Sequence, residues 1–283
     1  RTARNMEASL SIPTATSARA IPAKVLIENR VVINGHLAHT RGGKVSFTHL
    51  IGWAVVEALA EMPAMNASYV TDDAGRPTLR EPAHVAFGLA IDVPASSGER
   101  RLLVPSIKKA DLMDVAGFIA AYEGLVAKAR DGSLEVDDFR GTTVTLTNPG
   151  MIGTLHSVPR LMPGQGLIVG VGSMAYPAAF AGTSEETLAR QGIGKIVTLT
   201  STYDHRVIQG AASGEFLRLI ERKLLGLDGF WERTFESLRI PHEPVTWARD
   251  TTYDAELETG KPARVSELIH AFRQRGHLAA DTD

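Results

Sequence analysis

Short apolar segments bounded by turn residues recur along the chain, and they constrain its fold more than any other feature. Such runs are typical of buried strands. They cover residues 12–21, 84–94, 100–109, 142–147, 166–171 and 195–203, with a polar Ser96–Glu99 turn between the second and the third. The longest apolar stretches fall far short of the roughly 18 to 20 residues that a membrane span needs. The sequence therefore predicts a soluble, cytoplasmic protein with several strands and no membrane partner.

Helices are predicted between these strands, where apolar residues recur at helical spacing. The four clearest segments are 22–37, 46–62, 111–132 and 210–225. Pro22 is expected to begin the first, because the first helical position needs no N–H group. Asp111 is expected to cap the third helix, and Gly132 to end it.

A change of composition near Gly229 predicts a domain boundary. The 54 residues that follow hold two of the three tryptophans and an irregular stretch, RIPHEPVTWARD. A helix signal comes next, with Val265, Leu268, Ile269 and Phe272 on one face. The sequence thus predicts one domain over residues 1–229, followed over residues 230–283 by a linker and the first helix of another module.

Charge and cysteine content exclude several classes of function. The 30 basic and 32 acidic residues give a formal net charge of -2, so no overall field attracts the chain to nucleic acid. The chain contains no cysteine, which excludes disulfides, cysteine-ligated metals and a thiol nucleophile of its own. Any catalysis must use other side chains.

Three motifs suggest chemistry but favour a structural interpretation. Gly170–Ala175 matches the GxGxxA dinucleotide pattern, yet Tyr176-Pro177 interrupts the helix that this pattern requires. Ser213 stands one position away from that of a GxSxG nucleophile. His36 and His39 lie three residues apart, but no acidic or sulfur ligand has matching spacing, so no metal site is predicted.

The segment STYDHRVIQG, residues 201–210, is the first candidate site. Its histidine, His205, stands at the end of an apolar strand between Asp204 and Arg206, and Gly210 follows. The backbone turns at such a position, so a side chain can face a ligand. A lone histidine of this kind is more often structural, and a second feature is needed to favour catalysis.

A hydroxyl-rich strand end supplies that second feature. Thr147 and Asn148 end the strand over residues 142–147 and lead into a Pro149-Gly150 turn. A hydroxyl and an amide at such a strand end could donate hydrogen bonds to a developing oxyanion.

Together the two segments resemble the catalytic domain of the dihydrolipoamide acyltransferases, the E2 components of 2-oxo acid dehydrogenase complexes. The DHRxxDG signature of that family matches TYDHRVIQG except at Gln209, and its TITN-like strand followed by glycines matches TLTNPGMIG. Further similar segments, in order over residues 1–229, are VSFTHLIGWAVVEALAEMPAMNASY, HVAFGLAIDVP, LLVPSIKKADLMDVA and VPRLMPGQGLIVGVG.

The resemblance implies an α/β fold of the chloramphenicol-acetyltransferase type, a two-layer sandwich that assembles as a homotrimer. Active sites of this type lie between subunits, so His205 of one chain is expected to face Thr147 of its neighbour. In this reading His205 is the general base and Thr147 the oxyanion donor, whereas Asp204, Arg206 and Gly210 support the loop and Asn148 the pocket.

The tail, ARVSELIHAFRQRGHLAADTD, resembles the start of a thiamine-diphosphate-dependent 2-oxoglutarate dehydrogenase (E1) component. This order of modules is similar to that of fused 2-oxoglutarate decarboxylase/dehydrogenase enzymes. It implies transfer of a succinyl group between dihydrolipoamide and coenzyme A, which are substrates here. Thiamine diphosphate and Mg²⁺ are expected only beyond residue 283. No lipoyl-type DKA sequence occurs, so a lipoyl domain is expected from residues upstream of this chain or, in preference, from another protein, with dihydrolipoamide dehydrogenase as a further partner.

Gln209 departs from the family signature, in which an acid at this position is thought to hold an arginine. A neutral amide cannot neutralise a guanidinium group. A rival hypothesis is therefore a catalytically weak or inactive trimeric scaffold that organises E1 modules. An antibiotic acetyltransferase of the same fold is a third reading, which the E1-like tail disfavours.

Overall fold

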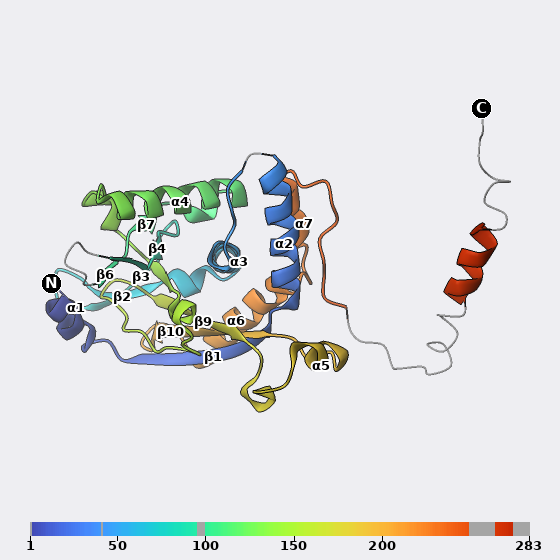
Figure 1. Ribbon diagram of the computed structural model, residues 1–283. Coiled ribbons are helices and arrows are strands. Elements are labelled where there is room, and N and C mark those ends of the chain that lie inside the picture. Colours follow the sequence, from blue (N-terminus) through green and yellow to red (C-terminus); the bar gives the residue numbers. More distant parts are fainter. Residues whose placement is uncertain (1, 41, 95–99, 249–263, 274–283) are drawn as a thin grey trace. The chain divides into compact units, whose positions relative to one another are not determined.

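A computed structural model describes residues 2–40, 42–94, 100–248 and 264–273 (Figure 1). The chain divides into two compact units, residues 1–247 and residues 248–283. The turn expected at Ser96–Glu99 lies outside the described residues. Within the described residues, no helix is long and apolar enough to cross a membrane.

A six-stranded mixed sheet forms the centre of the first unit. Its strands, in spatial order, are β1 (Thr14–Pro22), β10 (Ile196–Asp204), β9 (Leu167–Ala175), β8 (Val144–Thr147), β4 (Phe87–Leu89) and β7 (Ser106–Ile107). Strand β8 runs parallel to both of its neighbours, and the other pairs are antiparallel. Strand β8 therefore runs in the opposite direction to β10, and its last residue, Thr147, lies level with Thr200 in the middle of β10.

The two apolar runs expected at 84–94 and 100–109 each divide into two strands. Their inner parts, β4 and β7, pair within the main sheet, whereas their outer parts form a separate hairpin of β5 (Ile91–Pro94) and β6 (Arg100–Leu103). A second hairpin consists of β2 (Ser68–Thr71) and β3 (Pro77–Arg80).

Five of the described helices supply the second layer of a two-layer arrangement. They are α2 (Lys24–His39), α3 (Phe47–Glu61), α4 (Val115–Asp131), α6 (Gly210–Leu224) and α7 (Phe230–Ser237), with a 3-10 turn η1 at Pro63–Asn66 (Figure 1). Two shorter helices, α1 (Thr2–Ser9) and α5 (Glu185–Arg190), contribute no described residue to the main core. Because strand side chains alternate between faces, Leu146 and Leu199 enter the helix-facing core, and the threonines next to them face the other way. On the helix-facing side, Ser213 of α6 donates a buried hydrogen bond to Ser201. This serine therefore packs against the sheet and does not stand on a nucleophile turn.

Residues 153–166 lie against the other face of the sheet. The Thr200 hydroxyl donates to the Ser157 carbonyl (3.1 Å), and Leu161 packs on Ile168. The backbone of this segment approaches β9 so closely that a Cβ at Gly172 would stand 1.9 Å from the Leu155 carbonyl oxygen. The glycines of the GxGxxA pattern thus leave room for residues 153–166 to pack against the sheet. Strand β9 continues to Ala175, so no helix begins after these glycines.

Two expected helix ends differ in the structure. Pro22 ends strand β1, and α2 begins after it at Lys24. Helix α4 begins at Val115 with Asp114 as its cap, because the Asp114 carboxylate accepts from the Gly117 N–H (2.8 Å). Asp111, the expected cap, instead accepts from the Val85 N–H (2.7 Å). The end expected at Gly132 is present, with the left-handed φ of 71° that favours glycine.

The first compact unit extends past the boundary expected at residue 229. Phe230, Trp231 and Phe235 of α7 are buried in the main core, and the Trp231 indole N–H donates to the Leu224 carbonyl (3.0 Å). Further along, Asn29 of α2 exchanges two hydrogen bonds with the backbone of Val245. The change of composition at Gly229 therefore does not coincide with the end of the packed unit.

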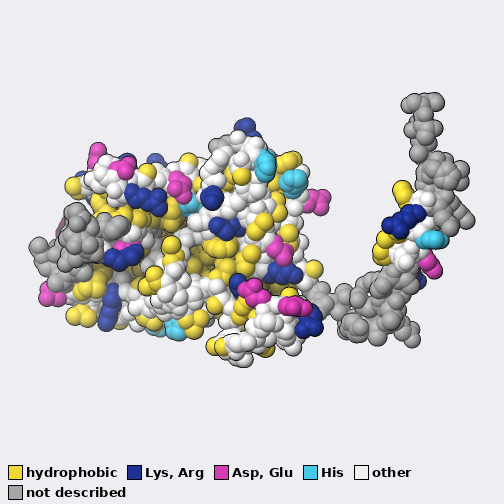
Figure 2. Space-filling view, viewed as in Figure 1, with side chains coloured by type: hydrophobic (Ala, Val, Ile, Leu, Met, Phe, Trp, Pro, Cys, Tyr) yellow, Lys and Arg dark blue, Asp and Glu magenta, His cyan; other side chains and the backbone are white. Residues whose placement is uncertain are grey.

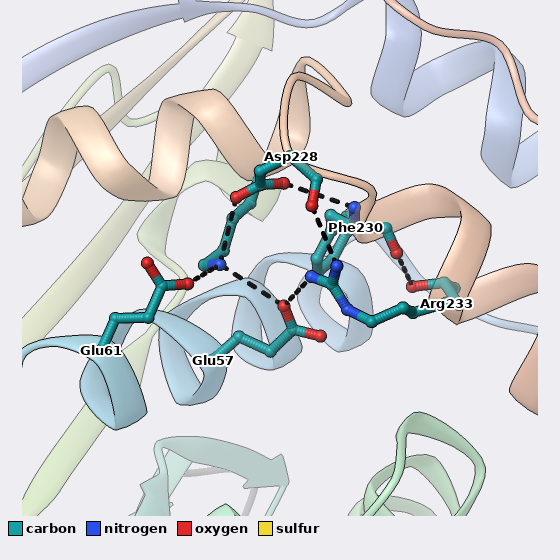
Figure 3. A network of polar contacts seen from close by, with 7 residues as sticks. Glu57, Glu61, Asp228, Phe230 and Arg233 are labelled. Atoms are coloured by element: carbon teal, nitrogen blue, oxygen red, sulfur yellow. Dashed lines mark hydrogen bonds and ion pairs between the residues drawn. The ribbon is translucent and has the colours of Figure 1, made fainter.

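A network of ion pairs fastens α7 to the helix layer (Figure 3). The Lys223 side chain is only 1% exposed, and its ammonium contacts Glu57, Glu61 and Asp228. The Arg233 guanidinium of α7 binds the same Glu57 carboxylate (2.6 Å). A buried lysine needs such partners, because an unpaired charge away from water is strongly unfavourable.

In the second unit, residues 264–273 form a helix, as the sequence predicts. Val265, Leu268, Ile269 and Phe272 are all exposed on it. Figure 2 shows apolar side chains on the surface of this helix.

Candidate active site

His205 lies on the turn that directly follows β10. Its backbone N–H donates to the Pro13 carbonyl (2.9 Å), and its ring meets the Tyr203 ring edge-on, with 5.6 Å between centroids. The residue is exposed, whereas Asp204 and Tyr203 before it are buried. The turn thus has a fixed backbone and presents one accessible imidazole.

Asp204 and Arg206, the residues on either side of His205, form an ion pair. The Asp204 carboxylate accepts from the Arg206 backbone N–H (3.0 Å), from Nε (2.9 Å) and from Nη2 (2.6 Å). Hydrogen bonding to Asp204 raises the pKa of Arg206. Asp204 therefore neutralises Arg206, so an acid at the position of Gln209 is not required for that purpose.

Gln209 and Gly210 mark the start of α6. Gln209 is exposed at the N-cap position, and its side chain does not cap the helix. Gly210 is the first helical residue, and a Cβ there would lie 3.5 Å from the Tyr203 hydroxyl.

Thr147 and Asn148 lie where β8 stops, level with the middle of β9 and β10. Thr147 is half-buried and, by strand alternation, lies on the face opposite the Leu146 side chain. The Asn148 amide donates to the Thr48 hydroxyl of α3 (2.8 Å). Asn148 thus fastens the end of β8 to α3. Sequence reasoning missed Thr48, because no local pattern links it to a strand one hundred residues later.

A single chain does not bring His205 and Thr147 together. Thr147 pairs with Gly170 of β9, and Gly170 pairs with Thr200 of β10. His205 lies five residues beyond Thr200, which corresponds to about 16 Å along the strand and about 10 Å across two strand spacings. The two side chains cannot contact one substrate atom from the same chain.

His49 belongs to the cap of α3 and not to a metal site. Ser46 accepts from the His49 N–H, and Nδ1 of His49 accepts from the Ser46 N–H, both at 3.2 Å. Nε2 therefore carries the proton, and it lies 3.0 Å from a Glu123 oxygen. Over the described ranges, no three potential ligands cluster around His36, His39 or any other side chain.

Burial lowers the pKa of His49 to about 4, and Glu123 is more than half exposed, so its charge is screened. The unfolded chain takes up a proton near pH 6.5, but the folded chain does so only near pH 4. Stability is therefore full above about pH 6.5 and falls as the pH drops toward 4, by on the order of 3 kcal/mol.

The substitution His49→Gln tests this pH dependence, since glutamine suits the same capping position and does not titrate. We expect the unfolding free energy, measured in urea at pH 7 and at pH 4.5, to fall less in the variant than in the wild type. The matched control His39→Gln alters an exposed histidine of α2 and is expected to leave the wild-type difference unchanged. Equal losses in all three proteins would contradict the assignment.

Comparison with known proteins gives relatives over the whole chain. A multifunctional 2-oxoglutarate metabolism enzyme from Mycobacterium sp. (strain JLS) is 59% identical over 281 residues, which are 99% of this chain and 22% of that protein. A 2-oxoglutarate dehydrogenase E1/E2 component from Corynebacterium glutamicum is 55% identical over 281 residues, 99% of this chain and 23% of that protein. The chain thus spans less than a quarter of the length of these relatives.

A solved structure shows the same fold. It is a dihydrolipoamide acetyltransferase from Azotobacter vinelandii in which the catalytic roles of a serine, a histidine and an asparagine were investigated. It is 26% identical, with a TM-score of 0.68, and the match covers 81% of this chain and 88% of that one. The α/β fold expected from the resemblance is therefore confirmed.

The family described as 2-oxoacid dehydrogenases acyltransferase (catalytic domain) matches residues 1–228. This range contains both sequence motifs, the six-stranded sheet and the turn that carries His205. The chain belongs to the family of 2-oxoacid dehydrogenase acyltransferases.

Proposed function

We propose that this chain transfers a succinyl group between dihydrolipoamide and coenzyme A, as the acyltransferase part of a larger 2-oxoglutarate-oxidising enzyme. The observation that carries the proposal is the exposed His205, held on a turn by the buried Asp204 and its arginine. The names of the two long relatives support 2-oxoglutarate as the parent substrate, and hence succinyl as the acyl group.

The chemistry follows from the proton affinities of the groups involved. Thiols have a pKa near 8.5 and are mostly protonated at neutral pH, whereas an ordinary imidazole near 6.5 can accept a proton. His205 takes the proton from the attacking thiol, and the sulfur forms a new bond to the thioester carbonyl carbon. When the tetrahedral intermediate collapses, the old carbon–sulfur bond breaks and the leaving thiolate takes the proton back. No acyl-enzyme forms, which suits a chain without cysteine.

Thr147 stabilises the oxyanion in this mechanism, and it comes from a neighbouring subunit. The separation of the two residues within one chain supports a homotrimer with sites between subunits. Beside Thr147, the side chains of Met151 and Ile152 are more than 80% exposed, which provides an apolar surface for a second copy to cover.

Two observations favour an active enzyme over a quiet scaffold. First, Asp204 already neutralises Arg206, so Gln209 leaves no unpaired guanidinium there. Second, the asparagine whose catalytic role was investigated in the Azotobacter vinelandii protein stands four residues after the histidine. Gln209 stands four residues after His205 and also carries an amide.

The remaining parts of the reaction come from outside this chain. A lipoyl domain presents dihydrolipoamide in trans, and dihydrolipoamide dehydrogenase reoxidises it. We assign residues 230–283 to the connection toward an E1 module, which would hold thiamine diphosphate and Mg²⁺. The packed part of this connection ends at Trp247.

An acyl-transfer assay with the purified chain tests the function. Succinyl-CoA and free dihydrolipoamide are mixed, and the release of coenzyme A is followed by chromatography, with acetyl-CoA as the competing acyl donor. We expect transfer that depends on the protein and favours the succinyl donor. An intact trimer that binds no coenzyme A in calorimetry, and transfers neither acyl group, would instead support the scaffold.

A further inference from the structure

We propose that Tyr69 is a positioning residue for the catalytic histidine. This inference rests on the proposed function and adds a residue outside the two motifs that form the candidate site. Tyr69 belongs to the β2–β3 hairpin, which pairs only within itself and stands apart from the six-stranded sheet. The Arg206 guanidinium lies over its ring, 3.7 Å from the centroid.

The contact between Tyr69 and Arg206 completes a ring of interactions around the turn. The backbone of Ala67 lies so near the start of β9 that a Cβ at Gly166 would stand 2.0 Å from the Ala67 carbonyl oxygen. The Gly166 carbonyl accepts from the Asp204 N–H (3.2 Å), and the Asp204 carboxylate holds Arg206. Arg206 then returns to Tyr69, two residues after Ala67.

His205 lies between the two charged members of this ring. Its ring makes an edge contact with Tyr203, and its backbone is fixed at Pro13. The Arg206 side chain beside it is held by the Asp204 carboxylate and by the Tyr69 ring, so loss of either support frees the guanidinium to move. The Asp204 carboxylate restrains the guanidinium within its own plane through the two N–H bonds. An aromatic face restrains it perpendicular to that plane, which a carboxylate cannot do. The hairpin therefore keeps the residue after the catalytic histidine in place.

A general base acts only at hydrogen-bonding distance from the proton it removes. A displacement of about 1 Å can lower a rate by up to about a hundredfold. Because Tyr69 does not take part in the reaction, its loss should lower kcat and leave substrate binding nearly unchanged. Phenylalanine keeps the aromatic face and should preserve the function, whereas leucine and methionine remove the face but fill similar space.

The test compares Tyr69→Leu, Tyr69→Met and Tyr69→Phe in the same 283-residue chain. We expect kcat to fall about tenfold in the leucine and methionine variants, with the KM for succinyl-CoA and for dihydrolipoamide within about twofold of wild type. The phenylalanine variant should retain near wild-type kcat. The melting temperature and the trimer should be unchanged in all three.

Tyr176→Leu is the matched control, because Tyr176 is also half-buried and also carries a cation, Lys195, over its ring (5.2 Å). It lies at the far end of the sheet from His205, so its kcat should equal that of the wild type. Unchanged kcat in both Tyr69→Leu and Tyr69→Met, or an equal loss in Tyr69→Phe, would overturn the inference. Failure of the proposed function is distinct from this, since the wild type itself would then show no transfer.

Discussion

Replacing His205 with alanine is expected to lower the rate of succinyl transfer by about 10²- to 10⁴-fold, the usual contribution of a general base. The loss should appear in kcat, because the imidazole acts on the proton of a thiol that is already bound. The side chain is exposed and makes one edge contact with Tyr203, so its removal should hardly change the melting temperature. The measurement is the steady-state rate of coenzyme A release from succinyl-CoA with dihydrolipoamide.

The control for this experiment is His39→Ala, an exposed histidine in the last turn of α2. It should retain full activity. If the His205 variant transfers succinyl at the wild-type rate, the imidazole is not the base and the proposed mechanism fails.

The sequence predicts the two strand ends of the site because each has a local signature. An apolar strand that runs into Asp204, His205 and Arg206 must leave the core at the charges, and the structure places β10 and its turn at that point. Strand β8 also ends where the sequence indicates, at Thr147, because a proline and a glycine follow shortly after it. Local chemistry determines such ends, so a single sequence shows them.

Contacts between distant segments have no such signature. The ring of Tyr69, for example, reaches Arg206 from a separate hairpin far away in the sequence. The end of the packed unit at Trp247 has no such signature either. Composition averages over α7, whereas burial of Phe230 and Trp231 depends on how this short helix packs against α4 and α6.

The proposed location of the site between subunits makes the second large effect measurable. If Thr147 donates to the oxyanion, Thr147→Val should lower kcat by about 10²- to 10³-fold, whereas Thr147→Ser keeps the hydroxyl and should stay active. Each site in a homotrimer would combine His205 of one subunit with Thr147 of the next. His205→Ala or Thr147→Val then impairs every site when all three subunits carry it.

Mixed trimers of the His205→Ala and Thr147→Val chains should regain activity that neither parent has. In every trimer that contains both chains, one of the three interfaces joins an intact histidine to an intact threonine. Random assembly from equal amounts should therefore restore about a quarter of the wild-type sites. The two chains are coexpressed with different affinity tags, purified through both tags in turn, and assayed beside each parent. Because double selection keeps only mixed trimers, their activity should be about a third of wild type. If each site were built within one chain, the mixed trimers would gain no activity over the parents, since each subunit lacks one of the two groups. The distance between Thr147 and His205 within the chain argues against that outcome.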